Sequence, residues 1–381
     1  MRRSTLRTAI AVVTAGLTLT ACGGSDSGGS GGSGGSDAAT ATSADDLGGM
    51  DALVKAAQKE GQLNVIALPP SWANYEEMLK TFGDKYKIKI NSANPDGSSQ
   101  DELNAVTSQK GQDRAPDVLD VGTTFAKQAA AQKLLASYKV ATWGDIPDNQ
   151  KESDGLWYND YGGFISIGCN ATIVKKCPTT FKALLDPQYK GQVALNGNPT
   201  QAAAAFSDVW AAALANGGSL DDIGPGVDFF VKVKKAGNFN PVESTPSTVE
   251  QGETPISLDW DYVNAGYTAK LKAAGTDWQV NVPSDGVFGS YYSQAISKFA
   301  PHPAAARLWE EFLYSDQGQN IWLKGLSRPV RLDAMTKAKT VDDTALSALP
   351  EVQGNVEFPD DKQQTAAQKV VADRWNAEMS G

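Results

Sequence analysis

Residues 62–93 read QLNVIALPPSWANYEEMLKTFGDKYKIKINSA, and this stretch decides the fold class. It begins with an apolar run typical of a buried strand. A proline-containing turn then leads into an amphipathic helix, and a second short strand ends the stretch. A helix with a capping box of Ser99 and Glu102 follows, then a third strand at 116–122 and a third helix at 124–135. Strands and helices that alternate at this spacing predict a mostly parallel sheet flanked by crossover helices, that is, an α/β lobe.

A second series of elements follows the polar region 138–159. We expect strands at 161–168, 192–197, 254–259, 278–283 and 289–298, and helices at 199–218, 226–237, 262–275, 300–315 and 364–379. About 335 residues lie from Leu47 to the end of the chain. A single hydrophobic core rarely supports a chain of this length, so we expect two lobes.

Composition narrows the classes of partner. The chain is 41% hydrophobic and 20% charged, which is ordinary for a globular protein. Its formal net charge is −10, and removal of Arg2, Arg3 and Arg7 with an N-terminal signal would make it −13. Such an acidic balance argues against nucleic acid and against electrostatic docking on anionic lipid.

The N-terminus predicts export and anchoring. Residues 1–21 combine three arginines with a short apolar core, as in a secretory signal peptide. Residues 19–22, LTAC, resemble the bacterial lipoprotein box, which implies that Cys22 carries lipid; the alternative is an ordinary secretory cut beside an incidental cysteine. The Gly/Ser-rich residues 22–46 are expected to form a flexible tether. The body would then work at the extracellular face of the membrane.

Two further cysteines, Cys169 and Cys177, stand in GCNATIVKKC. An extracellular location makes a disulfide between them plausible, and two unpaired thiols are the alternative. A zinc site is not expected, because two thiols alone make a poor cage and the single histidine, His302, is distant in sequence.

The usual catalytic signatures are missing. The sequence contains no Gly-Lys phosphate loop, no HExxH, no CxxC, no nucleophile elbow and no GxGxxG. His302 lies between two prolines, where we expect a solvent-facing residue at a helix start. We therefore expect a protein that captures a small molecule, without enzymatic activity, cofactor or resident metal.

Five stretches carry a resemblance to a known family: GFISIGCNATIV (163–174), TTFKALLDPQYKGQVALNGNP (179–199), GETPISLDWDYVNAG (252–266), GVFGSYYSQAISKFAPHPAAARLWEEFLYSDQGQ (286–319) and SRPVR (327–331). From about residue 61 to 334 the chain resembles the extracellular solute-binding proteins of ABC importers, in the branch of the spermidine/putrescine and ferric-iron receptors. The resemblance implies a periplasmic-binding-protein-like fold: two lobes joined by crossing strands, a ligand cleft between them and hinge closure on binding. It also implies a separate permease and ATPase as partners. We assign residues 47–160 and 288–334 to lobe 1, and 161–287 and 335–381 to lobe 2, in a monomer.

Ligand-contacting residues are expected beyond the carboxyl ends of the strands, where loops lead into helices. The candidates are Trp72, Ser98, Thr123, Thr200, Asp259, Trp260, Asp261, Tyr291 and Tyr292. We expect Asp259 or Asp261 to cap the helix that follows them. Neighbouring side chains of a strand point to opposite faces, so only one of Tyr291 and Tyr292 can face the cleft.

Three ligand chemistries remain open. An aromatic face beside carboxylates suits a cationic amine, and Trp260 falls where the resembling polyamine receptors place a stacking tryptophan. Tyr291 and Tyr292 point to ferric iron by resemblance, although the tyrosine pair of the iron receptors belongs at the passage where this chain has Trp260 and Asp261. The turns at 96–100 and 197–201 each open a helix and could bind a phosphonate.

The sequence therefore predicts the receptor lipoprotein of an ABC importer, with a polyamine or another amine-bearing solute favoured. Ferric iron and an aminophosphonate are alternatives within the same role. The competing classes are a cell-surface hydrolase that uses carboxylates in the same cleft and a passive scaffold. A search for product and a search for ligand-induced stabilisation separate these classes.

Overall fold

The computed structural model describes residues 36–349, 352 and 358–379, which belong to one compact unit. The expected signal peptide, the lipidation at Cys22 and the tether up to residue 35 lie outside the described residues. In the part of the chain that is described, we find no helix with the length and apolar character needed to cross a bilayer.

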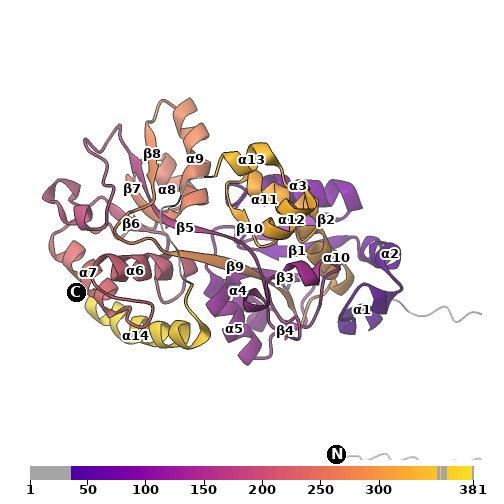
Figure 1. Cartoon of the computed structure of the whole chain (residues 1–381). Coiled ribbons are helices and arrows are strands. Elements are labelled where there is room, and N and C mark those ends of the chain that lie inside the picture. Colours follow the sequence, from indigo (N-terminus) through magenta and orange to yellow (C-terminus); the bar gives the residue numbers. More distant parts are fainter. Residues whose placement is uncertain (1–35, 350–351, 353–357, 380–381) are drawn as a thin grey trace, which may run out of the picture. The chain divides into compact units, whose positions relative to one another are not determined.

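The elements alternate as expected over most of the body (Figure 1). The strands are β1 (Gln62–Ile66), β2 (Lys89–Ala93), β3 (Val118–Gly122), β4 (Leu135–Ala136), β5 (Tyr158–Asn170), β6 (Val193–Leu195), β7 (Ile256–Trp260), β8 (Trp278–Asn281), β9 (Gly289–Ser297) and β10 (Arg328–Pro329). The helices are α1 (Ser36–Thr40), α2 (Met50–Glu60), α3 (Tyr75–Tyr86), α4 (Ser99–Ser108), α5 (Thr123–Ala131), α6 (Ala203–Ala215), α7 (Gly224–Lys235), α8 (Pro246–Glu250), α9 (Asp261–Ala273), α10 (Pro303–Leu313), α11 (Asp316–Lys324), α12 (Leu332–Ala338), α13 (Asp343–Ser347) and α14 (Asp361–Met379). Short 3-10 turns lie at Asp45–Leu47, Trp143–Asp145, Asp148–Gln150, Lys182–Leu185 and Pro187–Tyr189.

Strand β5 joins the two lobes. Its first half, Tyr158–Phe164, pairs with β9, while its second half, Ile165–Asn170, pairs with β7 and β8. All thirteen residues of β5 are buried, because each half forms part of the core of a different lobe. Figure 1 shows β5 and β9 side by side between β3 and the β6–β7 pair. The expected crossing-strand architecture is therefore confirmed.

The expectation of mostly parallel sheets is wrong. Among the described strands only the β1–β2 and β6–β7 pairings are parallel, and the other six pairings are antiparallel. The reason is the crossing itself. A strand that leaves one lobe and a strand that returns to it must run in opposite directions when they pair, as β5 and β9 do.

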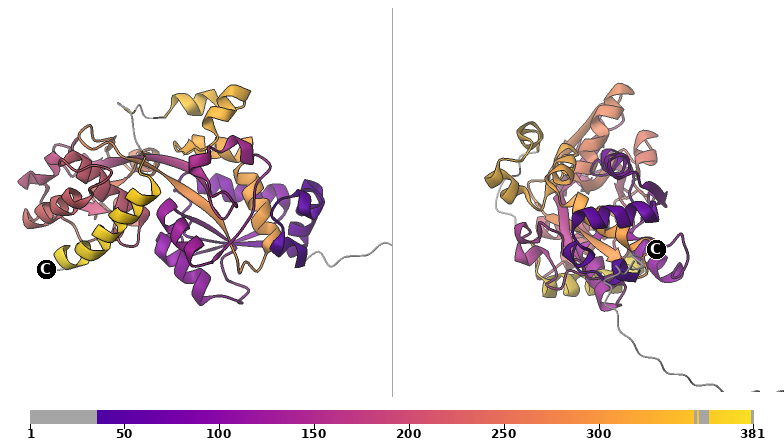
Figure 2. Two further views of the ribbon diagram at one scale, coloured as in Figure 1. Left: turned by 60° about the horizontal axis from the view of Figure 1, so that its bottom comes forward. Right: turned by 90° about the vertical axis from the view of Figure 1, so that its right-hand side faces the viewer.

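Beyond β10 the chain passes from lobe 1 to lobe 2 later than expected. Asn320 of α11 donates to Thr340 O and accepts from Asp342 N, so residues 335–349 pack on α11 and not on lobe 2. Helix α14 does pack on lobe 2, where its Trp375 ring lies 5.6 Å from Phe230 of α7. Figure 2 shows α14, in yellow, beside the helices of lobe 2.

The expected tether ends earlier than Asp46. Ala38 is fully buried, and the buried guanidinium of Arg307 donates to Ala39 O at 3.1 Å and to Ala41 O at 2.8 Å. Residues 36–46 are therefore part of the folded body, since small apolar side chains and an internal arginine anchor them on α10.

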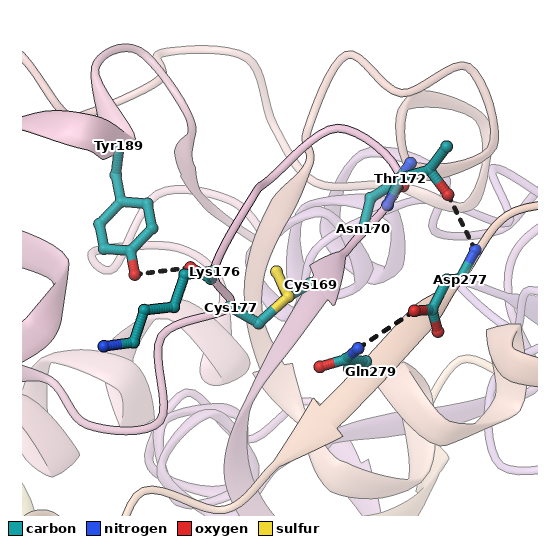
Figure 3. Close-up of a disulfide and its surroundings, with 8 residues drawn as sticks. All are labelled: Cys169, Asn170, Thr172, Lys176, Cys177, Tyr189, Asp277 and Gln279. Carbon is teal, nitrogen blue, oxygen red and sulfur yellow. Dashed lines mark hydrogen bonds between the residues drawn. A yellow bond between two sulfur atoms is a disulfide. The ribbon is translucent and has the colours of Figure 1, made fainter.

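Cys169 and Cys177 form a disulfide, with Cα atoms 5.8 Å apart, as expected. The bond ties the end of β5 to the loop after it. Figure 3 shows two hydrogen bonds beside it, from Tyr189 OH to Lys176 O and from Asp277 N to Thr172 Oγ1.

Replacing both cysteines by alanine is expected to lower the free energy of unfolding by about 2.5 kcal/mol, the loop-closure value for a separation of 8 residues. Urea unfolding of the oxidised wild type and of the double variant measures the difference. Reduced wild type is the control and should resemble the variant. Equal midpoints for all three would show that the bond contributes nothing to stability.

Candidate ligand-binding site

A concavity beside the crossing strands, here called the main cavity, encloses about 640 Å³ of space including its open mouth. Its walls are the loops after β1, β2 and β6, the starts of α4 and α6, the segment that leads into α8, and one residue each of β3, α9 and β9. The lining residues are Ala67, Pro69, Trp72, Pro95, Asp96, Gly97, Ser98, Ser99, Glu102, Asp120, Asn196, Ala202, Ala203, Ala204, Glu243, Ser244, Thr245, Pro246, Tyr267 and Tyr292. Both lobes contribute, and several of these residues follow the ends of strands, where we expected ligand contacts.

The charged residues among those that line the main cavity are all acidic. Four of its lining residues are acidic, namely Asp96, Glu102, Asp120 and Glu243, and none of the described residues that line it is Lys, Arg or His. Asp96 and Glu243 lie exposed at its rim, whereas Glu102 and Asp120 are 1% and 5% exposed. The deep part of the cavity therefore presents carboxyl groups with little water around them.

Helix α4 positions Glu102. The cap residue is Ser98, whose hydroxyl accepts from Asp101 N while the Asp101 carboxylate accepts from Ser98 N. The expected cap of Ser99 with Glu102 was thus one residue too late, which frees Glu102 for the cavity. Its Oε2 accepts from Asp120 N at 3.0 Å. Burial, and then the neighbouring charge of Asp120, raise the pKa of Glu102 well above its ordinary value.

Strand β3 positions Asp120. Its Oδ2 accepts from Tyr75 OH at 2.7 Å and from Tyr161 OH at 2.8 Å, while its Oδ1 has no donor among the described residues. Burial raises the pKa of Asp120 to about 7, although these hydrogen bonds oppose the shift. Asp120 therefore has an unfilled acceptor at a buried position beside the cavity.

Aromatic side chains form the other deep surface. The half-buried Trp72 ring meets Tyr292 edge-on at 5.6 Å, and Trp72 Nε1 donates to Tyr161 OH at 2.7 Å. Tyr267 of α9 faces them from lobe 2. The hydrogen bond links Trp72 through Tyr161 to Asp120, so the aromatic and acidic surfaces form one connected unit.

A second cavity of about 370 Å³ lies on the other side of the start of α6. Six of its fourteen lining residues are aromatic, and none of the described ones is charged: Gly122, Thr123, Thr124, Phe125, Ala203, Phe206, Ser207, Trp210, Trp260, Phe288, Ser290, Tyr291, Pro359 and Gln364. Tyr291 borders this cavity and Tyr292 the main one, as the alternation of strand side chains requires.

The candidate residues therefore divide into three groups. Trp72, Ser98 and Tyr292 line the main cavity; Thr123, Trp260 and Tyr291 line the second; Thr200, Asp259 and Asp261 line neither. Trp260 is only 1% exposed and touches the main cavity's wall indirectly, through an edge-on contact of its ring with Tyr292 at 6.2 Å. This arrangement does not place the Trp260 ring where a ligand in the main cavity could stack on it.

The two aspartates beside Trp260 have structural partners. Asp259 is 1% exposed and accepts at 2.8 Å from Asn196, which itself lines the main cavity; burial raises the pKa of Asp259 to about 7. Asp261 pairs with Arg328 at 2.8 Å and accepts from Phe164 N. Neither aspartate caps α9, whose cap position is held by Trp260, so that expectation was wrong. Thr200 is occupied as well, since it donates to Asn198 Oδ1.

Sequence reasoning missed Glu102, Asp120, Asn196, Glu243 and Tyr267. For Asp120 a signal existed, because an acid inside the apolar strand PDVLDVG is costly to bury unless it has a partner or a purpose. Glu102 was hidden by its assignment to the helix cap.

The two lobes touch beside the main cavity. Gln100 N, at the start of α4, donates to Gln201 O in the loop before α6 at 3.2 Å. A Cβ placed on Gly122 would lie 2.3 Å from Ala203 Cβ, so these residues are in direct contact. The contact separates the two cavities.

His302 is not the solvent-facing residue we expected. It is 7% exposed, and its Nδ1 lies 2.8 Å from Asp117 Oδ2. Burial opposes protonation, but the hydrogen bond and charge of Asp117 prevail and raise the pKa of His302. The described residues contain no cluster of three His, Cys, Asp or Glu side chains suited to a metal.

Comparisons with known proteins agree with this geometry. The model of the bacterial extracellular solute-binding protein family matches residues 113–351. A putative 2-aminoethylphosphonate-binding periplasmic protein of Salmonella typhimurium is 26% identical over 242 residues, which cover 62% of this chain and 68% of that protein.

Solved structures are similar in fold. The periplasmic binding protein AfuA from Actinobacillus pleuropneumoniae, with fructose-6-phosphate bound, superposes with a TM-score of 0.64 at 21% identity, covering 84% of this chain and 99% of that one. A putative spermidine/putrescine ABC transporter protein from Listeria monocytogenes has a TM-score of 0.61 at 13% identity, covering 82% and 98%. The two-lobe architecture is thus shared with binding proteins of different ligands.

Proposed function

The chain belongs to the bacterial extracellular solute-binding proteins, and from that premise we propose that its main cavity captures an amine-bearing solute for an ABC importer. The role of receptor for an import system follows from the family. The ligand class, the lipid anchor at Cys22 and a monomeric state are proposals for this chain, as are the permease and ATPase that would receive the solute.

The observation that carries the ligand class is the charge of the main cavity. Four acidic residues and no basic one line it among the described residues, and the two deepest acids have no basic partner there. An ammonium group would supply hydrogen bonds to these carboxyls, which are strong when one or both partners are charged. The ring of Trp72 beside them would add a cation–π attraction of about 0.5–2 kcal/mol.

A second ligand is supported by a specific observation. The N-termini of α4 and α6 both border the main cavity, through Ser98–Ser99 and Ala202–Ala204. Backbone N–H groups at helix starts favour anions. An aminophosphonate, with an ammonium and an anionic end, would use both the acids and the helix starts, and the name of the Salmonella relative points to the same chemistry. Ferric iron is less well supported, because Tyr291 and Tyr292 border different cavities.

A thermal-shift screen of the chain from Gly23 onward tests the proposal. Putrescine, spermidine, 2-aminoethylphosphonate and ferric citrate are the probes, and succinate is the control that has no amine. A true ligand at 100 times its dissociation constant adds about 2.7 kcal/mol to the free energy of unfolding. Stabilisation by succinate or iron but by no amine would overturn the assignment, and conversion of a bound amine to product would indicate the hydrolase class.

A further inference from the structure

The acids next to the main cavity form a connected cluster. Asp120 borders the cavity, and Asp160 lies behind it on β5, fully buried. A chain of hydrogen bonds links the two carboxyl groups. Gln294 Nε2 of β9 donates to Asp160 Oδ2 at 2.8 Å and to Tyr75 OH at 3.1 Å, and Tyr75 OH in turn donates to Asp120 Oδ2 at 2.7 Å. We call Asp120 and Asp160 the aspartate pair.

The surroundings of the aspartate pair contain acids and phenols. The titratable groups that face it are Tyr75 from α3, Glu102 from α4, Tyr161 from β5, Tyr262 from α9, Tyr292 from β9, Glu310 from α10, and Tyr314 directly after α10. Among the hydrogen-bond donors to either aspartate in the described structure there is no lysine or arginine. Two buried carboxyl groups that are linked by hydrogen bonds and have no cationic donor do not both ionise readily, so the pair holds a proton in the free protein.

We propose that capture of an amine in the main cavity expels a proton from the aspartate pair, so that the receptor holds its solute more tightly as the pH rises. The inference rests on the proposed function, since it needs a cationic ligand. The O–H bond of the shared proton breaks, its electron pair stays on the carboxylate that meets the ammonium, and the proton leaves for the solvent through the open mouth of the cavity.

The geometry accounts for the exchange. Asp120 Oδ2 is filled by two phenol donors, while Oδ1 has no donor among the described residues. An ammonium that reaches Asp120 supplies both the missing donor and the missing charge, and then the shared proton is no longer needed. Asp160 has donors on both oxygens, from Tyr161 N at 2.6 Å and from Gln294, and it can remain in place throughout.

The direction of the pH dependence of affinity follows from the number of protons that each form of the receptor binds. Burial raises the pKa of Asp120 to about 7 and that of Asp160 well above its ordinary value, so the free pair is protonated at neutral pH. A bound cation lowers the pKa of the pair. Because the free form binds more protons than the complex, affinity increases with pH between the two pKa values, by up to about tenfold per pH unit for one proton released.

Titration calorimetry with putrescine, from about pH 5.5 to pH 8 and in buffers of different ionisation enthalpy, measures affinity and proton release together. We expect affinity to rise several-fold per pH unit below about pH 7, with close to one proton released. Asp160→Asn removes the proton-sharing partner and keeps Asp120, so it should bind putrescine at pH 8 but release fewer protons at pH 6. Asp208→Asn, which changes a fully buried acid of α6 outside both cavity linings, is the matched control and should behave as wild type.

A readout without ligand separates this inference from the proposed function. The infrared spectrum of the free protein at pH 6 should contain a protonated-carboxyl band of the aspartate pair, and Asp160→Asn should remove it. Asp208→Asn removes only the separate carboxyl of Asp208, so the band of the aspartate pair should remain. A missing band, or an affinity for putrescine that is independent of pH and buffer, overturns the proton exchange while the amine receptor stands. If the band is present but no amine binds at any pH, the ligand class fails, and the exchange fails with it.

Discussion

Glu102→Gln is expected to weaken amine binding about a hundredfold, the larger of two strong effects that the site predicts. Loss of one partner of a buried charge pair costs roughly 2–5 kcal/mol, and a hundredfold in affinity is about 2.7 kcal/mol. The side-chain amide keeps the volume of Glu102 and can still accept from Asp120 N, so the fold should survive. Calorimetric titration of putrescine into wild type and variant, at the pH of tightest binding, measures the loss.

Glu311→Gln is the matched control for Glu102→Gln. Glu311 is also a buried glutamate that accepts a backbone N–H, from Ala141 at 3.0 Å, but it lies on α10 outside both cavity linings. It should leave putrescine affinity unchanged. If Glu102→Gln bound putrescine as tightly as the control, the deep carboxyls would not recognise the ligand, and an anionic or neutral solute would have to be considered instead.

Gly122→Ala is expected to weaken binding by roughly tenfold to a hundredfold by holding the lobes apart. The new Cβ would stand 2.3 Å from Ala203 Cβ, too close for any real pair of methyl groups. Overpacking of this kind costs about 1–3 kcal/mol. The backbone of Gly122 has φ −54°, which any residue adopts, so the effect is steric and not conformational. Since the lobes can separate to relieve the clash, the free protein should lose little stability.

Two measurements and one control test Gly122→Ala. Calorimetry gives the affinity, and solution scattering with saturating ligand should show a larger radius of gyration than for wild type. Gly144→Ala is the control, because a Cβ there meets nothing within 4 Å and its φ is not positive. An unchanged affinity together with an unchanged envelope would mean that the Gly122–Ala203 contact does not belong to the ligand-bound arrangement.

Much of the fold was accessible from pattern alone. Alternating apolar runs and amphipathic stretches placed β1, α3 and β2 within a few residues, because local hydrophobic periodicity reflects the period of each element. The direction of β9 was not accessible in this way. Whether two strands run parallel depends on which lobe each comes from, and that is a property of the whole chain path.

The main cavity contains some, but not all, of the residues that the sequence suggested as ligand contacts. The strand-end rule led to Trp72, Ser98 and Tyr292, which do line the main cavity. It failed at Asp259 and Asp261, since a side chain at a strand end can turn inward to Asn196 or Arg328 as easily as toward a ligand. Which of the two happens depends on partners far away in sequence.

The sequence by itself predicted an acidic α/β protein of two lobes without a recognisable reaction centre, because these properties follow from composition and local periodicity. The disulfide, too, could be anticipated from two cysteines and a compartment. Only the tertiary structure brought Glu102 and Asp120 to one surface, hid Trp260 behind Tyr292 and pressed Gly122 against Ala203. The physical reason is that the burial of a side chain and the charges around it depend on residues from many elements. No local stretch of sequence contains all of those residues.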